Sequence, residues 1–519
     1  MILMLERWND LGDYARLVKT ESLEVRDYQA NIIKTIATGK NTLVVLPTGL
    51  GKTLIAVFAA ARVLYSERKV VFLAPTKPLS EQHFSSISSF LEIEKGTVTL
   101  LTGETKSAKR SQLWESSMVI VATPQTMAND LKSGNVSMDK IGLVIFDECH
   151  RSIGKYAYTY VAEECKLLGI QIVGLTASPG SDRKKIKELI DILGIRAIEA
   201  RTHSDLDVAP YIKGKRMRTI YVDKGDTISR IEEVIKPDID RHLIKLHQMG
   251  VSQFRSFDLM PKGRLIEMGR TIDKIEAKNY KFGAVFNYVY VLNLSHALDL
   301  LTTEGLFSFC SYMDSLASRE KKSKGVSSIL NNDEISKCVE DAKAALAAGE
   351  EHPKMYMLVE ILKGDFAGKR AIVFAQYRST IKKITEVLKR NGIRADAFIG
   401  KKEGVTVSQQ NATIAEFRSG KFEVLVSTSI GEEGLDIPLV DAVIFYEPVP
   451  SAIRNIQRRG RTGRIRFGDV VVLVARRTKD ETYLMVSRMR EKRMMEILEE
   501  MKYRLGRNEL IQSRQSKLV

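Results

Sequence analysis

Residues 42–53 read Thr-Leu-Val-Val-Leu-Pro-Thr-Gly-Leu-Gly-Lys-Thr, an apolar strand pattern that runs directly into a glycine-containing loop. Glycines let such a loop wrap a phosphate group, and the helix predicted over 54–65 adds the positive potential of its N-terminus. Lys52 can reach the outer phosphates of a nucleotide, and the Thr53 hydroxyl can bind Mg²⁺. The strict G-x-x-x-x-G-K-[ST] pattern has glycine first, where this chain has Leu46. The residues expected to hold ATP are Pro47, Thr48, Gly49, Leu50, Gly51, Lys52 and Thr53.

Around this loop, short β-branched runs alternate with helical stretches. Continuous apolar strands between helices are typical of a parallel sheet with helices on both faces. The same alternation returns after residue 365, so we predict an α/β fold class with two parallel-sheet domains. The runs are 42–46, 70–73, 119–121, 143–146 and 171–175 in the first domain, and 371–374, 424–426, 442–445 and 470–474 in the second.

The stretch between the two domains has a different pattern. From about 225 to 350 the β-branched runs thin out and helical spacing prevails, which predicts an all-helical insert domain. Within it we expect the polar segment 319–332 to form an exposed loop. After the second domain, an amphipathic helix over about 480–506 is expected to pack on that domain, and a solvated tail to follow. The predicted divisions are 1–215, 216–352 and 353–480, with a C-terminal helix and tail over 481–519.

The composition narrows the class of partner. The 519 residues include 80 Lys and Arg against 64 Asp and Glu, a net charge of +16. This excess favours a polyanionic partner, nucleic acid before a membrane surface. The four cysteines form no Cys-x-x-Cys pair, which argues against a disulfide framework and a cysteine-type zinc site. No apolar run reaches ~18 residues and no signal peptide begins the chain, so we expect a cytoplasmic protein without a membrane partner.

A second motif, Phe-Asp-Glu-Cys-His, ends the strand predicted over 143–146. A carboxylate at the end of a strand can hold Mg²⁺ opposite a phosphate loop, which is the role expected for Asp147. The adjacent Glu148 can polarise the attacking water as a general base. His150 has no second His or Cys at ligand spacing, so a coupling role is favoured over a metal-binding one.

A third motif, Gln-Arg-Arg-Gly-Arg-Thr-Gly-Arg, covers 457–464 in the second α/β domain. Arginines three apart on a turn of helix lie on one side of it. Phosphoryl transfer needs positive charge on the γ-phosphate, and an arginine finger contributes ~10³–10⁵ in rate. We expect Arg461 and Arg464 to supply this charge. With Lys52, Asp147 and Glu148 they make up the predicted catalytic set.

In this order on two α/β domains, the three motifs resemble a superfamily 2 DEAH-like (DECH) helicase, whose domains are RecA-like. The resemblance implies that Gln29, in Arg26-Asp27-Tyr28-Gln29, contacts the adenine base. It implies that Gly434, Asp436 and Gln457 complete the nucleotide site. Residues implied to couple hydrolysis to movement are His150, Thr176 and Ser178. Residues implied to contact nucleic acid are Thr76, Lys77, Thr102, Gly103, Thr123, Gln125, Gln376, Arg378 and Thr428.

Within this superfamily, the phosphate loop, the Pro-Thr-Lys-Pro-Leu string at 75–79 and the helical insert are similar to the archaeal Hef and eukaryotic FANCM branch. That resemblance implies ATP- and Mg²⁺-dependent 3′→5′ movement on DNA. It also implies action on forks and four-way junctions in DNA repair and replication-fork processing, in the nucleus if the source is eukaryotic. Family members often carry a nuclease-type region after the motor; this sequence stops at Val519 without one, so nuclease activity is not carried over from the resemblance.

Two other interpretations stay open. One is an RNA-directed helicase of the innate-sensing or Dicer type, which shares the Asp-Glu-x-His box and a helical insert. The other is a branched-DNA-binding scaffold without motor activity, against which the intact Lys52, Glu148 and arginine pair argue.

Overall fold

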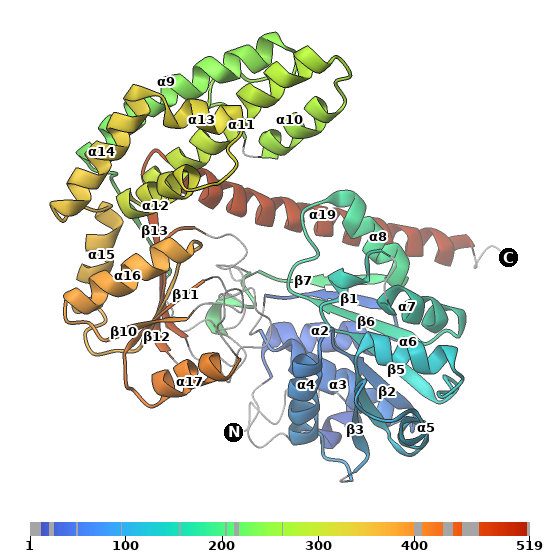
Figure 1. The fold of residues 1–519 in the computed structure, drawn as a ribbon. Coiled ribbons are helices and arrows are strands. Elements are labelled where there is room, and N and C mark those ends of the chain that lie inside the picture. Colours follow the sequence, from blue (N-terminus) through green and yellow to red (C-terminus); the bar gives the residue numbers. More distant parts are fainter. Residues whose placement is uncertain are drawn as a thin grey trace.

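The computed structural model describes residues 12–19, 25–47, 50–94, 96–154, 157–202, 205–211, 217–261, 263–398, 407–428, 440–448 and 467–515. It consists of two parallel sheets covered by helices and a helical bundle that lies above the second sheet (Figure 1). The predicted α/β fold class with an all-helical insert is therefore confirmed.

The first sheet has seven parallel strands in the order β3-β4-β2-β5-β6-β1-β7. Its residues alternate between two core clusters, one on each face, because successive side chains of a strand point to opposite sides. Two edge strands, β3 and β7, were not predicted. The strands are β1 (Thr42–Val45), β2 (Lys69–Leu73), β3 (Val98–Leu101), β4 (Val119–Ala122), β5 (Ile141–Phe146), β6 (Gln171–Thr176) and β7 (Ala197–Ala200).

Helices connect these strands and cover both faces. Their ends follow local sequence: α8, for example, begins after Asp182, whose carboxylate accepts from two backbone N–H groups, and ends at Gly194 with φ of 59°. The helices are α2 (Asp27–Ala37), α3 (Lys52–Leu64), α4 (Lys77–Phe90), α5 (Ser107–Ser116), α6 (Pro124–Lys132), α7 (Ala157–Leu167) and α8 (Arg183–Leu193).

The second sheet has six parallel strands in the order β10-β11-β9-β12-β13-β8. Helix α15 (Pro353–Lys363) and α16 (Arg378–Arg390) pack on one face, and α17 (Val407–Arg418) packs on the other. The strands are β8 (Met217–Val222), β9 (Ala371–Phe374), β10 (Ala395–Phe398), β11 (Val424–Ser427), β12 (Val440–Phe445) and β13 (Phe467–Ala475).

Strand β8 corrects a predicted boundary. Residues 216–352 were assigned to the helical insert, but Met217–Val222 pairs in parallel with Val470–Ala475 of β13. The chain therefore enters the second sheet first, leaves it to form the bundle, and returns at α15. The bundle is inserted within the second domain.

The bundle is built around α11, a 26-residue helix whose buried residues face several neighbours. One prediction fails here: the segment expected as an exposed loop over 319–332 contains α13, which buries Val326 and Ile329 and is capped by Ser323. The bundle helices are α9 (Asp226–Gln248), α10 (Gly263–Asp273), α11 (Lys278–Thr303), α12 (Leu306–Ala317), α13 (Lys324–Leu330) and α14 (Asp333–Ala347).

The C-terminal helix α19 (Lys479–Gln515) corrects another prediction. Only its first turns pack on the second sheet, through Leu484. It then crosses to the first sheet, as the red helix in Figure 1 shows, and joins the first-domain core through Met494, Ile497, Leu498 and Met501. The helix also continues to Gln515, through most of the segment expected as a tail.

The four cysteines are buried thiols, and burial raises the pKa of Cys165 and Cys310 to about 12. Within the described ranges, the helices are all too short or too polar to cross a membrane.

Candidate nucleotide and nucleic-acid site

The phosphate loop joins β1 to α3, as its sequence predicts. Gly51 precedes α3 with φ of 77°, a left-handed conformation that favours glycine. A Cβ atom at this position would lie 2.1 Å from Gln29 Nε2. Lys52 is 9% exposed, and its Nζ donates to the Leu46 carbonyl at 3.2 Å. The ammonium group is therefore held at the loop; Thr48 and Gly49 lie outside the described residues.

Two side chains of α2 fasten this loop. Gln29 Nε2 donates to the Leu50 carbonyl at 3.0 Å, and its Oε1 accepts from the Arg26 backbone N–H. The buried Tyr28 hydroxyl donates to the same Leu50 carbonyl at 2.9 Å. The Gln29 amide thus has protein partners at both ends in this structure, and its contact with adenine stays a prediction. Sequence reasoning missed Tyr28.

The carboxylate pair lies directly after β5. The Asp147 backbone N–H donates to the Leu73 carbonyl at 2.9 Å, and its carboxylate oxygen Oδ2 lies 2.9 Å from His83 Nε2. Glu148 has φ of 47° and ψ of 45°, a left-handed conformation that costs a non-glycine residue ~1–3 kcal/mol. Such strain is common where a side chain must be aimed at a site.

The three predicted coupling residues come together at the end of β6. His150 Nδ1 lies 3.0 Å from Thr176 Oγ1, which also accepts from the Ser178 backbone N–H at 3.2 Å. His150 Nδ1 is also 3.3 Å from Glu148 Oε2. A chain of contacts therefore runs from Glu148 to Ser178. It extends further, because Ser178 Oγ lies 3.2 Å from Met494 Sδ on α19.

The residues of this site suit Mg²⁺ and a nucleotide. Magnesium prefers oxygen ligands and is held by one or two carboxylates together with phosphates. Thr53 offers a hydroxyl and Asp147 a carboxylate. The described residues contain no cluster of three or more His, Cys, Asp or Glu side chains that would form an all-protein metal cage.

The predicted nucleic-acid contacts of the first domain follow three neighbouring strands. Thr76 and Lys77 follow β2, Thr102 and Gly103 follow β3, and Thr123 follows β4. These strands adjoin in the order β3-β4-β2, so their loops share one edge of the sheet. Gln125 is exposed and a Cβ at Gly103 would meet nothing, whereas Thr102 is buried.

Lys77 has an ion-pair partner, whereas the neighbouring Thr76 hydroxyl has no hydrogen-bond partner in the described structure. The Lys77 ammonium pairs with Glu104 at 2.6 Å, and the Thr76 Oγ1 atom is buried. Thr123 caps α6 by accepting from the Thr126 backbone N–H.

The second domain contributes a similar edge. Gln376 follows β9, Arg378 begins α16 and Thr428 follows β11, the neighbour of β9. The Gln376 backbone N–H donates to the buried Glu447 carboxylate. The remaining predicted residues of this domain, Gly434, Asp436, Gln457, Arg461 and Arg464, lie outside the described residues.

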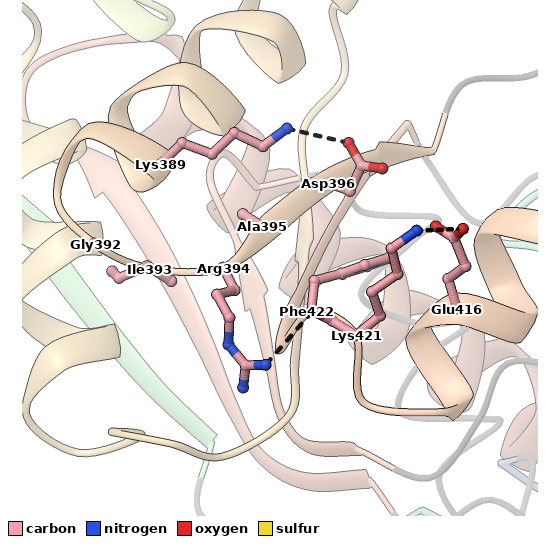
Figure 2. Close-up of a pocket in the computed structure, with 9 residues that line it drawn as sticks. All are labelled: Lys389, Gly392, Ile393, Arg394, Ala395, Asp396, Glu416, Lys421 and Phe422. Carbon is pink, nitrogen blue, oxygen red and sulfur yellow. Dashed lines mark hydrogen bonds and ion pairs between the residues drawn. The ribbon is translucent and has the colours of Figure 1, made fainter.

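A surface pocket on the second domain lies elsewhere. Figure 2 shows it at the start of β10 and beside Phe422, which precedes β11, so it lies at the amino ends of these strands. Four of its charged side chains pair with one another, Lys389 with Asp396 and Lys421 with Glu416. The fifth, Arg394, pairs with Glu423 outside the pocket lining. The described predicted residues of this domain, Gln376, Arg378 and Thr428, follow the carboxyl ends of β9 and β11, so this pocket is separate from them.

Comparisons with known proteins agree on the domain types. The model "DEAD/DEAH box helicase" matches residues 26–186, and "Helicase conserved C-terminal domain" matches 353–466. The model "Putative ATP-dependent RNA helicase, helical bundle" matches 228–349.

Three similar proteins cover most of the chain. The crystal structure of the Pyrococcus furiosus Hef helicase domain has a TM-score of 0.76 and 40% identity, over 89% of this chain and 98% of its own. A Methanocaldococcus jannaschii protein, "Putative ATP-dependent RNA helicase", is 39% identical over 95% of this chain and 63% of its own length. The Neurospora crassa ATP-dependent DNA helicase mph1 is 33% identical over 88% of this chain and 42% of its own. This chain thus spans about half the length of these two curated relatives.

Proposed function

Because this chain belongs to the superfamily 2 helicases of the Hef/FANCM type, we propose that it is an ATP-dependent DNA helicase or translocase. Its proposed substrates are forked and four-way DNA in repair and replication-fork processing, with 3′→5′ movement. The proposed location is the cytoplasm, or the nucleus of a eukaryotic cell. The observation that carries the proposal is one edge of the first sheet, along which lie the phosphate loop, the carboxylate pair and the three loops predicted to contact nucleic acid.

The nucleotide chemistry follows from these positions. Lys52 neutralises phosphate charge from the start of α3, and Thr53 and Asp147 would hold Mg²⁺. When bound, the metal supplies positive charge to the phosphates and the leaving group. Glu148 orients the attacking water, and its left-handed backbone sets the direction in which its side chain leaves the chain. Arg461 and Arg464 complete the set from the second domain, so catalysis requires the two domains to close.

Movement follows from the contacts of the coupling residues. Changes at Glu148 pass through His150 and Thr176 to the end of β6. Domain closure and reopening then shift the nucleic-acid edges of the two sheets relative to each other. Contacts to phosphate and sugar suit this motion, because a motor must ignore base sequence.

An RNA-directed helicase is the second candidate. It is favoured by the family model that matches the helical bundle, whose description names an RNA helicase. The excess positive charge of the chain fits either nucleic acid.

The two candidates are separated by steady-state ATP hydrolysis at fixed salt with matched single-stranded, duplex, forked and four-way DNA and with duplex RNA. We expect the strongest stimulation from forked or four-way DNA, and unwinding of duplexes that carry a 3′ but not a 5′ tail. Strongest stimulation by duplex RNA would support the second candidate instead. No stimulation by any of these would contradict both.

Two substitutions test the catalytic set. We expect Glu148→Gln to lower kcat about 10²–10⁴-fold, because it removes a general base, and to leave nucleotide binding largely intact. Lys52→Ala should lower both nucleotide affinity and turnover. The measurement is ATP hydrolysis with forked DNA, alongside binding of a fluorescent nucleotide.

The control is Glu163→Gln, an exposed position on α7 that should behave like the unmodified protein. Unchanged turnover in both active-site variants would contradict the proposed catalytic set. Binding of forked DNA by an unmodified chain that hydrolyses no ATP would favour the scaffold interpretation.

A further inference from the structure

We propose that His83 is a positioning residue that orients the Asp147 carboxylate for Mg²⁺ and joins helix α4 to the nucleotide site. The inference rests on the proposed function, since it assigns the metal to Asp147. Sequence reasoning gave His83 no role, because it lies within an ordinary helix 64 positions from its partner.

The geometry is that of a specific contact. His83 Nε2 lies 2.9 Å from Asp147 Oδ2, and the two side chains are 12% and 9% exposed. A carboxylate accepts hydrogen bonds, so Nε2 carries the proton and donates. The ring also packs against Phe72 of β2, with ring centroids 4.4 Å apart, so it is held on a second side. The contact fixes the rotation of the carboxylate and thus the direction of its other oxygen.

The other ring nitrogen shows that packing alone does not explain a histidine here. His83 Nδ1 is buried and has no hydrogen-bond partner within the described structure. A buried polar atom without a partner is unfavourable, and an apolar side chain would avoid it. The contact with Asp147 is what a histidine provides at this position and an apolar residue does not.

Helix α4 extends this contact to the nucleic-acid edge. It begins directly after Thr76, and Thr76 and Lys77 are predicted nucleic-acid contacts. The preceding strand β2 also holds the Asp147 backbone, because the Leu73 carbonyl accepts from its N–H at 2.9 Å. The β2–α4 segment therefore holds Asp147 by both its backbone and its side chain. A displacement at Thr76 reaches the metal-binding carboxylate through His83.

The test compares two substitutions of similar size in the full chain. His83→Gln keeps an N–H donor near the position of Nε2, and His83→Met has none. The readouts are the Mn²⁺ affinity of the ADP-bound protein by electron paramagnetic resonance and the affinity for a fluorescent nucleotide without metal. Outer-shell partners of metal ligands contribute about 10–100-fold to metal affinity. We expect His83→Met to weaken Mn²⁺ binding by this factor and His83→Gln to restore it, with metal-free nucleotide binding unchanged in both.

Gln82→Met, at an exposed position of the same helix, is the matched control and should bind Mn²⁺ like the unmodified chain. Unchanged Mn²⁺ affinity in folded His83→Met would overturn the inference, as would an equal loss in His83→Gln. If His83→Met does not fold, His83→Phe answers the same question, because it keeps the packing on Phe72 and lacks the donor.

The outcome is separable from the proposed function. A chain that hydrolyses ATP with forked DNA but is insensitive at His83 overturns the inference alone. A chain without nucleic-acid-stimulated hydrolysis, whose Mn²⁺ affinity still depends on His83, overturns only the proposed function.

Discussion

His352 shows how one buried residue ties the helical bundle to the second sheet domain. Its Nδ1 accepts from the Lys354 backbone N–H at 3.0 Å, and its Nε2 donates to the Thr302 carbonyl at 3.1 Å. Both nitrogens are therefore used by a neutral ring. Burial and then the positive charge of Lys354 lower the pKa of His352 to about 3.

This low pKa predicts that acid lowers the stability of the contact between the bundle and the second sheet domain. An unfolded histidine has a pKa of ~6.5, so between pH 6.5 and 3 the unfolded chain binds one more proton and stability falls as pH falls. At pH 5 the loss is about 2 kcal/mol from this residue. We expect His352→Gln to lack this part of the pH dependence. The measurement is urea unfolding of both proteins at pH 7 and pH 5.

The unmodified chain and His352→Gln must be compared because Glu304, which lies near His352, also titrates in this pH range. Its effect on the stability is opposite to that of His352. Burial raises the pKa of Glu304 to about 7, so its contribution to stability increases as pH falls from 7 towards 4.5. Identical pH dependence in His352→Gln and the unmodified chain would contradict the assignment.

The sequence predicts the position of a single site residue when that residue belongs to a local motif. Lys52 and Asp147 follow their strands as the motifs indicate. Each belongs to a short motif that continues directly from its strand, so its position relative to the strand can be predicted from neighbouring residues. His83 and His352 could not be predicted. Their partners lie 64 and 50 positions away, so their roles exist only once the chain has folded.

Helix α19 contacts both sheet domains. It begins where the buried Asp480 accepts from Lys354 Nζ and the Ala475 backbone N–H, both at 3.0 Å. Its later turns lie on the first domain, where Glu500 pairs with Arg183 of α8 at 2.6 Å. The Ser178–Met494 contact places it against one of the predicted coupling residues. The helix is thus a physical link between the second domain and the end of β6.

We predict that Leu498→Ala destabilises the first domain by about 2–5 kcal/mol, because it leaves a cavity in that domain's core. Leu498 is fully buried there. The measurement is chemical unfolding monitored by a probe in the first sheet.

Met489→Ala serves as the control, since Met489 is 58% exposed on the same helix and should change stability little. Equal effects of the two substitutions would argue that α19 does not contribute to the first-domain core.

The amphipathic period predicted this helix but not the surface that it covers. A repeat of apolar residues identifies which face is buried, whereas the partner depends on where the helix starts and how far it runs. Helix α13 was missed for a related reason: it buries few apolar residues within a polar stretch, so the periodic signal is weak.

The whole molecule is organised by a chain path that leaves the second sheet and returns to it. Strand β8 pairs with β13, and the helical bundle lies between them in sequence. Both ends of the bundle are thereby attached to the second sheet domain. The run Met-Arg-Thr-Ile-Tyr-Val has strand character, but nothing local identifies a partner so distant in sequence, which is why the boundary was misplaced.

Hydrogen exchange on the full chain tests this organisation. Val472→Ala on β13 removes buried apolar atoms worth about 1.6 kcal/mol, so we expect amide exchange in β8 to accelerate about tenfold, together with β12 and β13. Exchange in β1 should not change.

Val121→Ala in β4, equally buried in the first sheet, is the counterpart and should accelerate exchange in β1 but not in β8. If Val121→Ala instead accelerates amide exchange in β8, then β8 unfolds together with the first domain.

The path of β8 also sets an order of events during synthesis. Among the described strands of its sheet, β8 leaves the ribosome first, and β13, the strand with which it pairs, leaves last. Roughly 250 residues separate the two, which is about 12–50 s of translation at ~5–20 residues per second. The first sheet and the bundle can fold in that interval. Until β13 is synthesised, the edge of β8 that pairs with it keeps its backbone N–H and C=O groups unpaired.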